Sequence, residues 1–299
     1  MNKQVNVLIS TYNGEKYIID QINTIKNQTY KNIKIYVRDD GSTDSTKEIL
    51  KDLSKKNEIT FFDGDNLRWG RSFMTLLKNS CEGDYWAFCD QDDIWLPHKI
   101  EWAVEWLSKQ NEDVPSLFHS AYYLMDENLS VKIGEYVKPK YEFDFRRSLT
   151  DCLYQGFSIV INKKMRELML MGNINYLSSH DWWACLLVTE FGVSKFDNRI
   201  ASYHRRLDSS MSGGGLKGKI RWFKNVLMNK DSDINNVAKE FVRVFEDQAD
   251  NKNLKLAKMF IIDKYSIINS MKKAFYPKRW RSNIISEISI RLLMLIGKI

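Results

Sequence analysis

Residues 33–55 read IKIYVRDDGSTDSTKEILKDLSK, and this stretch decides the class of fold. Ile33–Val37 is mostly apolar and has the length of a buried strand. Ser45–Lys55 carries its apolar residues at helical spacing, on one face. The acidic, glycine-containing segment between the two is typical of a tight turn. The stretch therefore predicts a strand, a turn and a helix, which is the unit of a sheet covered by helices.

The same unit recurs before and after this stretch. We expect further strands at Val5–Ser10, Ile59–Phe62 and Tyr85–Cys89, and helices at Glu15–Asn27, Ser72–Asn79 and Lys99–Lys109. This alternation predicts an α/β fold with parallel βαβ units in a doubly wound sheet. Beyond it we expect strands at Leu117–Tyr123, Phe157–Ile161 and Ile200–Tyr203, and a helix at Asp181–Phe191.

Ligands of such sheets bind beyond the carboxyl ends of the strands. That rule points to residues 10–15, 39–44 and 89–95. The third segment holds Asp90, Asp92 and Asp93, and three carboxylates so close together repel one another unless a cation joins them. On an extended backbone Asp90 and Asp92 point to the same side, so we expect them to share one Mg²⁺ or Mn²⁺ ion. The alternative is a solvated acidic loop.

The second segment, Asp39-Asp40-Gly41-Ser42-Thr43-Asp44, has two interpretations. Its acids suit hydrogen bonds to a base N–H or to ribose hydroxyls. Ser42 or Asp44 would equally cap the next helix, with no ligand involved.

Composition narrows the function classes. The chain has 299 residues, 43% hydrophobic and 28% charged, which is enough for one large domain and a smaller one. Its net charge of +7 is concentrated in the last third, and basic surfaces favour polyanions or anionic lipid. No helix-turn-helix, zinc-finger or RNA-binding signature accompanies this charge, so we expect no nucleic-acid partner. Salt-dependent binding to random DNA would revive that alternative.

We expect the catalytic part to be cytoplasmic. The first residues, MNKQVNVLIS, lack the long apolar core of a signal peptide. No apolar run approaches the roughly 20 residues of a membrane span.

Three segments, STYNG at 10–14, RDDGSTDST at 38–46 and CDQDDIWLP at 89–97, resemble the nucleotide-binding half of a family 2 glycosyltransferase with the GT-A fold. The resemblance covers residues 4–210, and the DQDDIW form is most similar to bacterial rhamnosyltransferases of cell-wall and capsule assembly. It implies a mostly parallel, Rossmann-like sheet flanked by helices, with a nucleotide-sugar donor and a divalent metal.

The resemblance also assigns roles by position. Asp92 would be the main metal ligand, with Asp90 and His204 as further candidates. The nucleotide-binding set would be Ser10, Thr11, Tyr12, Asn13, Glu15, Asp40, Arg68, Arg71, Asp90 and Gln91. For the two arginines the alternative is surface solvation.

Asp181 is the candidate general base. Members of the family carry an acidic pair or a His-Asp pair at the start of a helix at this point of the chain, and inverting transfer needs one carboxylate to accept the proton of the acceptor hydroxyl. The alternative is a first-turn acid favoured by the helix dipole. His180, Trp182 and Trp183 would contact the acceptor or the diphosphate, although two adjacent tryptophans on one helix cannot both face the same way.

One segment departs from the family. Relatives commonly have a Tyr-Arg-x-His element after the next strand, whereas here His204 directly follows the tyrosine. His204 is therefore a candidate metal or diphosphate ligand, and Arg205 would neutralise the diphosphate. Ser209–Gly215 is predicted to form a lid over the donor.

The domains are expected to be a catalytic domain at 1–213 and a helical region at 214–299. Basic residues flank apolar stretches in the second, which favours either an anionic membrane surface or packing, on the catalytic domain or in a homodimer. Together these features predict an inverting, metal-dependent transferase that moves L-rhamnose from dTDP-L-rhamnose to a lipid-linked saccharide at the inner face of the cell membrane. The alternatives are a hexosyltransferase that uses a UDP-sugar, or a scaffold subunit that binds a nucleotide sugar without catalysis.

Overall fold

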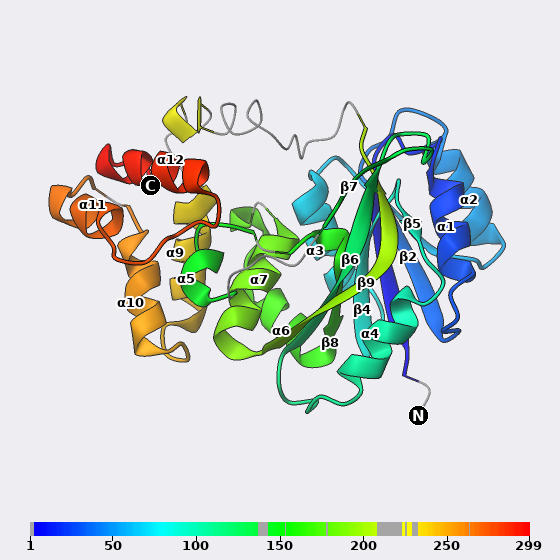
Figure 1. Cartoon of the computed structure of the whole chain (residues 1–299). Helices are drawn as coiled ribbons and strands as arrows, with labels where there is room; N and C mark the ends of the chain where they lie inside the picture. Colours follow the sequence, from blue (N-terminus) through cyan, green and yellow to red (C-terminus); the bar gives the residue numbers. More distant parts are fainter. Residues whose placement is uncertain are drawn as a thin grey trace.

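The computed structural model describes residues 3–136, 143–152, 154–177, 179–207, 223–224, 226–228, 233–262 and 264–299. A curled sheet with helices on both faces fills one end of the molecule, and C-terminal helices form the other end (Figure 1). The predicted α/β class is confirmed. The predicted boundary between residues 213 and 214 and the predicted lid at Ser209–Gly215 lie outside the described residues.

The N-terminal half follows the predicted alternation closely. Its strands are β1 (Val5–Thr11), β2 (Ile33–Asp39), β3 (Thr60–Asp63) and β4 (Tyr85–Asp90), and its helices are α1 (Ile18–Lys26), α2 (Thr46–Lys55), α3 (Trp69–Asn79) and α4 (Lys99–Leu107). The four strands pair in parallel in the order β3-β2-β1-β4.

The rest of the sheet is mixed. It contains β5 (Ile94–Trp95), β6 (Ser116–Met125), β7 (Lys132–Glu135), β8 (Ile159–Asn162) and β9 (Val193–Arg205), and the order continues from β4 as β8-β6-β9-β5. Strand β8 is antiparallel to both β4 and β6, whereas β6 and β9 are parallel. Helices α5 (Phe145–Ser148), α6 (Lys163–Met171) and α7 (His180–Phe191) belong to this part.

Two hydrophobic cores lie on opposite faces of the sheet, because successive strand side chains alternate between faces. Val5, Val7 and Ile9 of β1 pack with α1, α2 and α4. Leu8 between them packs with α3, α6 and α7. Both faces of β1 are buried, which explains the uninterrupted apolar residues Val7, Leu8 and Ile9.

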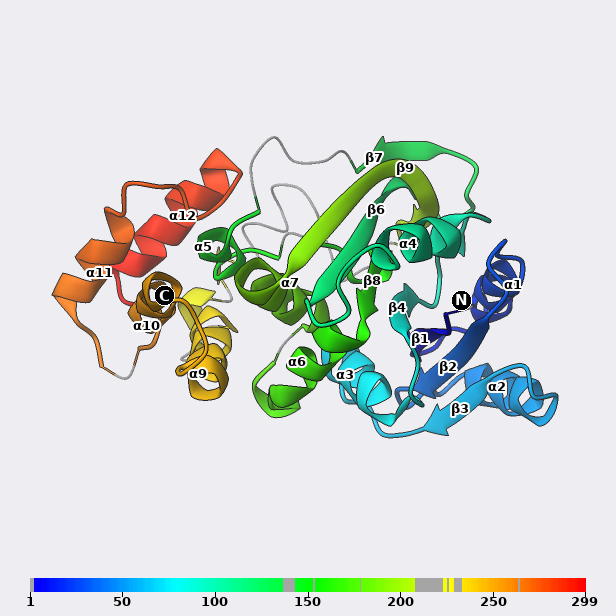
Figure 2. The same ribbon diagram turned by 90° about the horizontal axis from the view of Figure 1, so that it is seen from below.

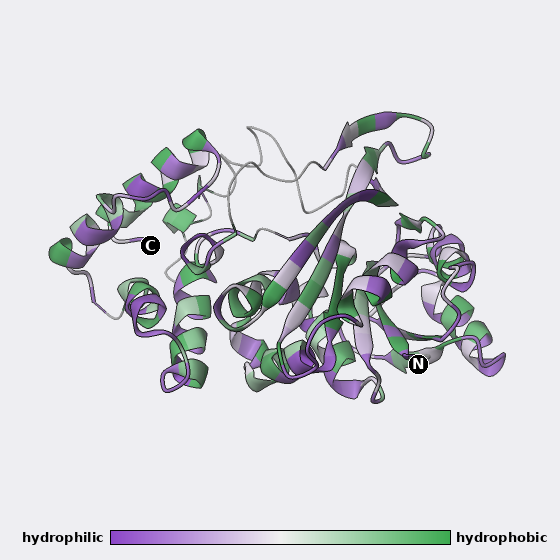
Figure 3. Cartoon of the chain, turned by 60° about the horizontal axis from the view of Figure 1, so that its bottom comes forward, coloured by the Kyte–Doolittle hydropathy of each residue, from purple (hydrophilic) through white to green (hydrophobic). Residues whose placement is uncertain are grey.

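The expected C-terminal helical extension is also confirmed. It comprises α9 (Asp233–Phe245), α10 (Asn251–Met259), α11 (Ile267–Ala274) and α12 (Ile284–Leu295), seen from below in Figure 2. The rings of Phe145 and Phe241 are 4.9 Å apart, as are those of Phe191 and Phe245. These contacts join the extension to the core that contains α7. Hydrophobic and hydrophilic residues alternate along the extension (Figure 3).

Candidate active site

The carboxyl ends of β1, β2 and β4 lie side by side, as predicted. Ser10 of β1 is in register with Arg38 of β2 and with Asp90 of β4, and Thr11 is in register with Asp39. Because these strands are parallel, all three motif segments meet at one edge of the sheet.

Hydrogen bonds join the loops that follow β1 and β2. Ser42 Oγ accepts the N–H of Asn13 at 2.9 Å, and Asn13 Oδ1 accepts the N–H of Thr43 at 2.9 Å. Thr46 Oγ1 accepts the N–H of Gly14 at 2.8 Å. Asn13 has a φ of 49°, in the left-handed region that asparagine tolerates. The two loops therefore form one supported surface at the edge of the sheet.

Glu15 and Tyr12, both expected in nucleotide binding, have different surroundings. Glu15 Oε2 accepts the N–H of Ser45 at 2.9 Å, directly before α2, so its carboxylate helps to join the two loops. The Tyr12 side chain is 47% exposed, which leaves its ring available to a nucleoside.

Gln91 supports the first motif from the end of β4. Its Oε1 accepts the N–H of Tyr12 at 2.9 Å and the hydroxyl of Thr11 at 2.5 Å, and its Nε2 donates to Tyr12 O at 3.1 Å. A Cβ on Gly14 would meet Gln91 Oε1 and Thr11 Oγ1 too closely, so a larger residue here would displace the Gln91 amide. Gln91 thus shapes the loop on which the nucleotide is expected to lie.

Asp40, expected to bind the base, is buried in a polar network. It forms an ion pair with Arg38, and its Oδ1 accepts the N–H of Leu67 at 2.9 Å. Arg38 Nη1 donates to Ser72 Oγ at 3.0 Å, and Ser72 Oγ lies 2.6 Å from Ser10 Oγ. Arg38 was overlooked in the sequence, although a cation directly before two aspartates signals such a pair. The contact of Asp40 with a base stays a prediction.

Asp90, Asp93 and His204 form a cluster in which the possible metal-ligating atoms lie within 4.8 Å of one another. His204 Nδ1 is 2.7 Å from Asp93 Oδ1. The short strand β5 explains this contact across the chain, because Ile94 pairs with Tyr203 in antiparallel register. That pairing brings the last residues of β9 to the turn after β4.

The charges of this cluster interact strongly. Burial, with the charges of Asp93 and Asp92, raises the pKa of Asp90 well above its ordinary value. Burial and the charge of Asp93 raise the pKa of Asp92 to about 6. Burial alone would lower the pKa of His204, but the carboxylate of Asp93 raises it to about 9. A divalent cation bound between these carboxylates would offset their mutual repulsion.

The prediction that Asp90 and Asp92 share one side of an extended backbone is wrong. β4 ends at Asp90, and residues 91 and 92 form a turn. Asp93, which the sequence placed in the acidic segment without a ligand role, joins Asp90 and His204 in the cluster. The role of Asp92 as the main metal ligand stays a prediction.

Two residues absent from the predicted site hold this cluster in place. Lys99 is fully buried and donates to Phe157 O at 2.9 Å, and burial lowers its pKa to about 8 against the opposing charge of Asp93. The ring of Phe157 stacks on His204 with centroids 4.3 Å apart. A lysine at the first position of an amphipathic helix gives no sequence signal that it is buried.

Asp181, the candidate base, lies in the first turn of α7 and lines a cavity. Its Oδ1 accepts the N–H of Trp182 at 2.8 Å and the hydroxyl of Ser179, and its Oδ2 accepts the N–H of Gly156 at 3.2 Å. Burial raises the pKa of Asp181 to about 6, against the opposing effect of the Trp182 and Gly156 N–H groups. Gly156, which donates to Asp181, directly precedes Phe157, whose ring stacks on His204, so the base and the acidic cluster are held by one short segment.

The three residues around Asp181 divide between core and cavity. His180 is buried between Phe73 and Phe88, at centroid distances of 4.3 and 4.6 Å, and burial lowers its pKa to about 3. Trp183 is fully buried in the core. Trp182 donates to Ser148 O at 2.6 Å and lines the cavity beside Asp181. Of the three, only Trp182 lies where it can meet an acceptor in this conformation.

The arginines expected near the diphosphate lie in three settings. Arg68 is exposed at the start of α3, and its φ of 66° and ψ of 152° are backbone angles that favour glycine. Arg71 donates to Asn175 O at 2.9 Å. Arg205 donates to Glu127 O at 2.5 Å, and its charge opposes the raised pKa of Asp92.

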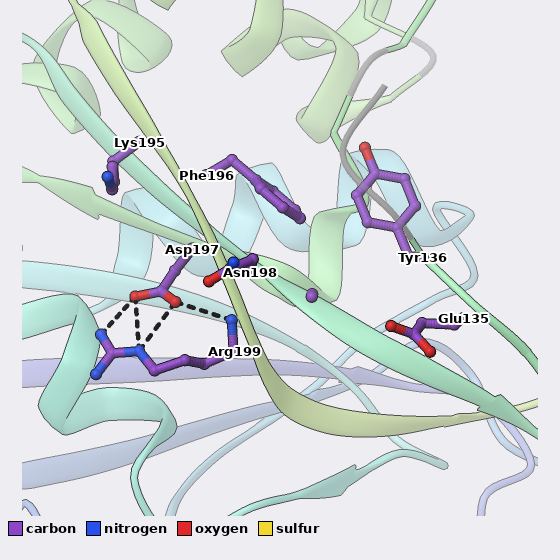
Figure 4. A pocket seen from close by; sticks show the side chains of 8 residues that line it. Glu135, Tyr136, Lys195, Phe196, Asp197, Asn198 and Arg199 are labelled. Atoms are coloured by element: carbon purple, nitrogen blue, oxygen red, sulfur yellow. Dashed lines mark hydrogen bonds and ion pairs between the residues drawn. The ribbon is translucent and has the colours of Figure 1, made fainter. Parts of the chain in front are cut away.

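A separate hollow of about 670 Å³ borders β6, β7 and β9 (Figure 4). Asp197 turns toward Arg199 there and forms a two-point ion pair, with Oδ2 3.0 Å from Arg199 Nε. None of its lining residues belongs to the predicted nucleotide, metal or acceptor sets.

Comparison with known proteins finds a family match that includes the same three segments. Residues 6–168 match the family described as Glycosyl transferase family 2, a span that includes the ends of β1, β2 and β4. The chain belongs to glycosyl transferase family 2. The predicted enzyme class, a glycosyltransferase, is supported by this membership and by the curated relatives below.

An uncharacterized glycosyltransferase of Rickettsia conorii is 36% identical over 136 residues, which are 45% of this chain and 22% of the relative. The chain thus spans about a fifth of the length of that relative. WfgD of Escherichia coli, named as a UDP-Glc:alpha-D-GlcNAc-diphosphoundecaprenol beta-1,3-glucosyltransferase, is 24% identical over 91% of this chain and 95% of its own.

The solved structure of S. aureus TarS 1–349 with UDP-GlcNAc superposes with a TM-score of 0.59 at 14% identity. The match covers 98% of this chain and 81% of TarS 1–349. It confirms the GT-A-like fold, including the C-terminal helices.

Proposed function

We propose that this family 2 glycosyltransferase moves a sugar from a nucleoside diphosphate to a lipid-linked saccharide and inverts the anomeric centre. The observation that carries the proposal is that Gly156 and Phe157 link Asp181 to the cluster of Asp90, Asp93 and His204, at the edge where the three strand-end motifs meet. The sheet edge would bind the nucleoside, the cluster the diphosphate region, and the cavity at Asp181 the acceptor.

A Mg²⁺ or Mn²⁺ ion fits the cluster. Among the described residues, Asp93 Oδ2 is buried without a hydrogen-bond partner, and two carboxylates with one imidazole are a donor set suited to hard or borderline divalent cations. Asp90, Asp93 and His204 would hold the ion, and Asp92, the main ligand expected from the sequence, is a further candidate. When bound, the metal would stabilise the negative charge of the departing diphosphate.

Asp181 would act as the general base. One of its oxygens would accept the proton of the acceptor hydroxyl, while the hydroxyl oxygen forms a bond to C1 of the sugar. The bond from C1 to the diphosphate oxygen breaks on the opposite face, so the configuration inverts and no covalent enzyme intermediate forms. A pKa of about 6 suits a base that is ionised at neutral pH and still holds a proton well.

Two donors deserve the first test. The DQDDIW motif favours dTDP-L-rhamnose as the donor, because it resembles the motif of rhamnosyltransferases. Transfer of the rhamnose with inversion would give an α-linked product. The name of WfgD supports a UDP-hexose instead, because that relative matches nearly the whole chain.

The same relative supports a proposal for the acceptor and the location. WfgD is named for an acceptor on diphosphoundecaprenol, and a lipid of this kind would bring the chain to the inner face of the cell membrane, as predicted from the sequence. No helix within the described part of the chain has both the length and the apolar character to cross a bilayer. An anionic membrane surface therefore remains our proposed partner for the C-terminal helices, with a homodimer as the alternative.

The decisive experiment is metal-dependent turnover of a panel of nucleotide sugars, with lipid-linked saccharide acceptors supplied. We expect one donor to react, with Mg²⁺ or Mn²⁺ required. Asp181→Asn should lower transfer by about 10²–10⁴-fold, the range of general base catalysis, and leave donor binding intact. Asp247→Asn, an exposed substitution outside the site, is the matched control. Donor binding without turnover on any sugar would instead support the scaffold function.

A further inference from the structure

The cavity beside Asp181 has walls from two distant parts of the chain. Its volume is about 400 Å³, within the roughly 300–1,000 Å³ of small-molecule sites. Trp69, Gln155, Asp181 and Trp182 line it from the catalytic half. Asp233 and Ile234 at the start of α9, together with Arg281 and Ile299 around α12, line it from the C-terminal extension.

The extension holds its wall in place through specific contacts. Thr150 Oγ1 donates to Trp280 O at 3.0 Å, and Arg281 donates back to Thr150 O. The N–H of Arg281 donates to Glu287 Oε2 of α12 at 2.7 Å. The fully buried Trp280 donates to Lys273 O of α11 at 2.9 Å. These hydrogen bonds fix the C-terminal wall of the cavity to the catalytic half.

The lining favours a neutral polyhydroxylated ring over a phosphate. Asp151, Asp181 and Asp233 place three carboxylates in the lining, which contains the guanidinium of Arg281, and the charge of Arg147 also acts on Asp151. Such an excess repels a diphosphate, whereas carboxylates accept hydrogen bonds from sugar hydroxyls. Trp69, which is 44% exposed, and Trp182 offer apolar faces for the C–H side of a sugar ring.

We propose that this cavity binds the terminal sugar ring of the acceptor, with its lipid diphosphate outside, and that the C-terminal extension sets acceptor specificity. The inference rests on the proposed function and names the ligand of its acceptor site. The family match ends at residue 168 and the extension lies beyond it. Relatives could therefore share the donor half and differ in acceptor through this wall.

Binding can test the proposal without turnover. The probes are short-chain lipid diphosphates that carry one sugar each, N-acetylglucosamine, N-acetylgalactosamine or glucose, and the same lipid diphosphate without a sugar. Tryptophan fluorescence reports binding, because Trp69 and Trp182 line the cavity. We expect wild type to bind at least one sugar-bearing probe about tenfold or more tightly than the sugar-free lipid, the effect of a hydrogen bond to a charged group.

Two variants address the C-terminal wall. Asp233→Asn keeps the size of the side chain and removes the charge, and Ile234→Trp fills the cavity. In both variants, the ratio of the affinity for the sugar-bearing probe to the affinity for the sugar-free lipid should fall toward one. The control Asp247→Asn should keep the wild-type ratio. Because Asp233→Asn changes only the charge, it tests the wall even if Ile234→Trp fails to fold.

Three results would overturn the site: no probe preferred over the sugar-free lipid, an equal loss of affinity for both kinds of probe in Asp233→Asn, or an unchanged preference in both variants. Acceptor-independent hydrolysis of the nucleotide sugar, measured in parallel, separates this proposal from the proposed function. Sugar discrimination without any donor turnover would contradict the transferase and leave the sugar site standing.

Discussion

At the scale of single residues, Gly14 packs tightly against Gln91 and Thr11 at the sheet edge where we expect the nucleotide. In Gly14→Ala, the new methyl would displace the Gln91 amide from Thr11 and Tyr12. We expect a loss of about 1–3 kcal/mol in the free energy of unfolding, the cost of leaving such groups unpaired, and weaker nucleotide binding. Gly134→Ala is the control, because its Cβ would meet Leu124 at 3.8 Å, an ordinary contact. Urea unfolding that shows equal stability for both variants would contradict this role of Gly14.

The pH dependence of transfer is a second residue-scale prediction. The base must be ionised, and burial raises the pKa of Asp181 from 3.8 to about 6. Transfer at saturating metal and substrates should therefore fall about tenfold per pH unit below about 6, instead of below about 4 for an ordinary aspartate. Tryptophan fluorescence should show that the protein remains folded over this range. A rate constant that stays flat down to pH 5 would exclude Asp181 as a base with a raised pKa.

Single residues also show what the sequence could and could not predict. The strand-end rule located the acidic motif correctly, because parallel strands bring their carboxyl ends together. The choice between Asp92 and Asp93 depended on the turn at residues 91 and 92, which local alternation does not reveal. Arg38, Lys99 and Phe157 act on the site through burial and tertiary contacts, and no spacing in the sequence encodes these.

At the scale of elements, the start of α3 combines backbone strain with a candidate ligand. Arg68 has backbone angles that cost a residue other than glycine about 1–3 kcal/mol. Arg68→Gly should relieve this strain and stabilise the fold by about 1 kcal/mol, once the extra freedom of glycine in the unfolded chain is subtracted. Asn57→Gly is the control, because asparagine tolerates the φ of 57° found there.

Thermal unfolding and nucleotide titration separate the two roles of Arg68. If its guanidinium contacts the donor, Arg68→Gly should bind nucleotide sugar more weakly while it melts at a higher temperature. A lower melting temperature would show that the strained backbone is held by contacts of the arginine side chain.

Elements with clear periodicity were predicted within a few residues, as α2 and β4 illustrate. The later elements were harder for a physical reason. β9 runs from Val193 to Arg205, but its register with β6 shifts between Ser120 and Tyr122, so it was recognised only near Ile200–Tyr203. β5 has two residues and no periodicity, yet its pairing with β9 places His204.

At the scale of the whole molecule, the sheet and the C-terminal extension share one core and one cavity. The three strand-end motifs lie in the half that the family match covers, and the cavity that we propose for the acceptor is completed by the other half. We therefore expect loss of the extension to impair folding as well as acceptor binding, which is why point substitutions are the suitable probes.

The end of the molecule formed by α11 and α12 carries an exposed apolar surface. In α11 the exposed residues include Ile267 and Ile268, and in α12 they include Ile285, Ile288 and Leu292. Lys264, Lys272, Lys278 and Arg279 are exposed around them. Apolar helix faces bordered by cations suit an anionic bilayer surface.

Vesicle co-sedimentation tests this surface. We expect binding to vesicles with anionic lipid, weaker at high salt because the attraction is partly electrostatic. The double variant Ile268→Glu with Ile288→Glu should lower binding at least about tenfold, since each isoleucine contributes about 1.5–3 kcal/mol when buried. Ile133→Glu, an equally exposed apolar position on β7, is the control and should bind like wild type. The membrane proposal is contradicted if the wild type does not bind vesicles and light scattering shows a dimer that the double variant disrupts. The surface would then bind a second copy of the chain, and the lipid-linked acceptor would reach the cavity by another route.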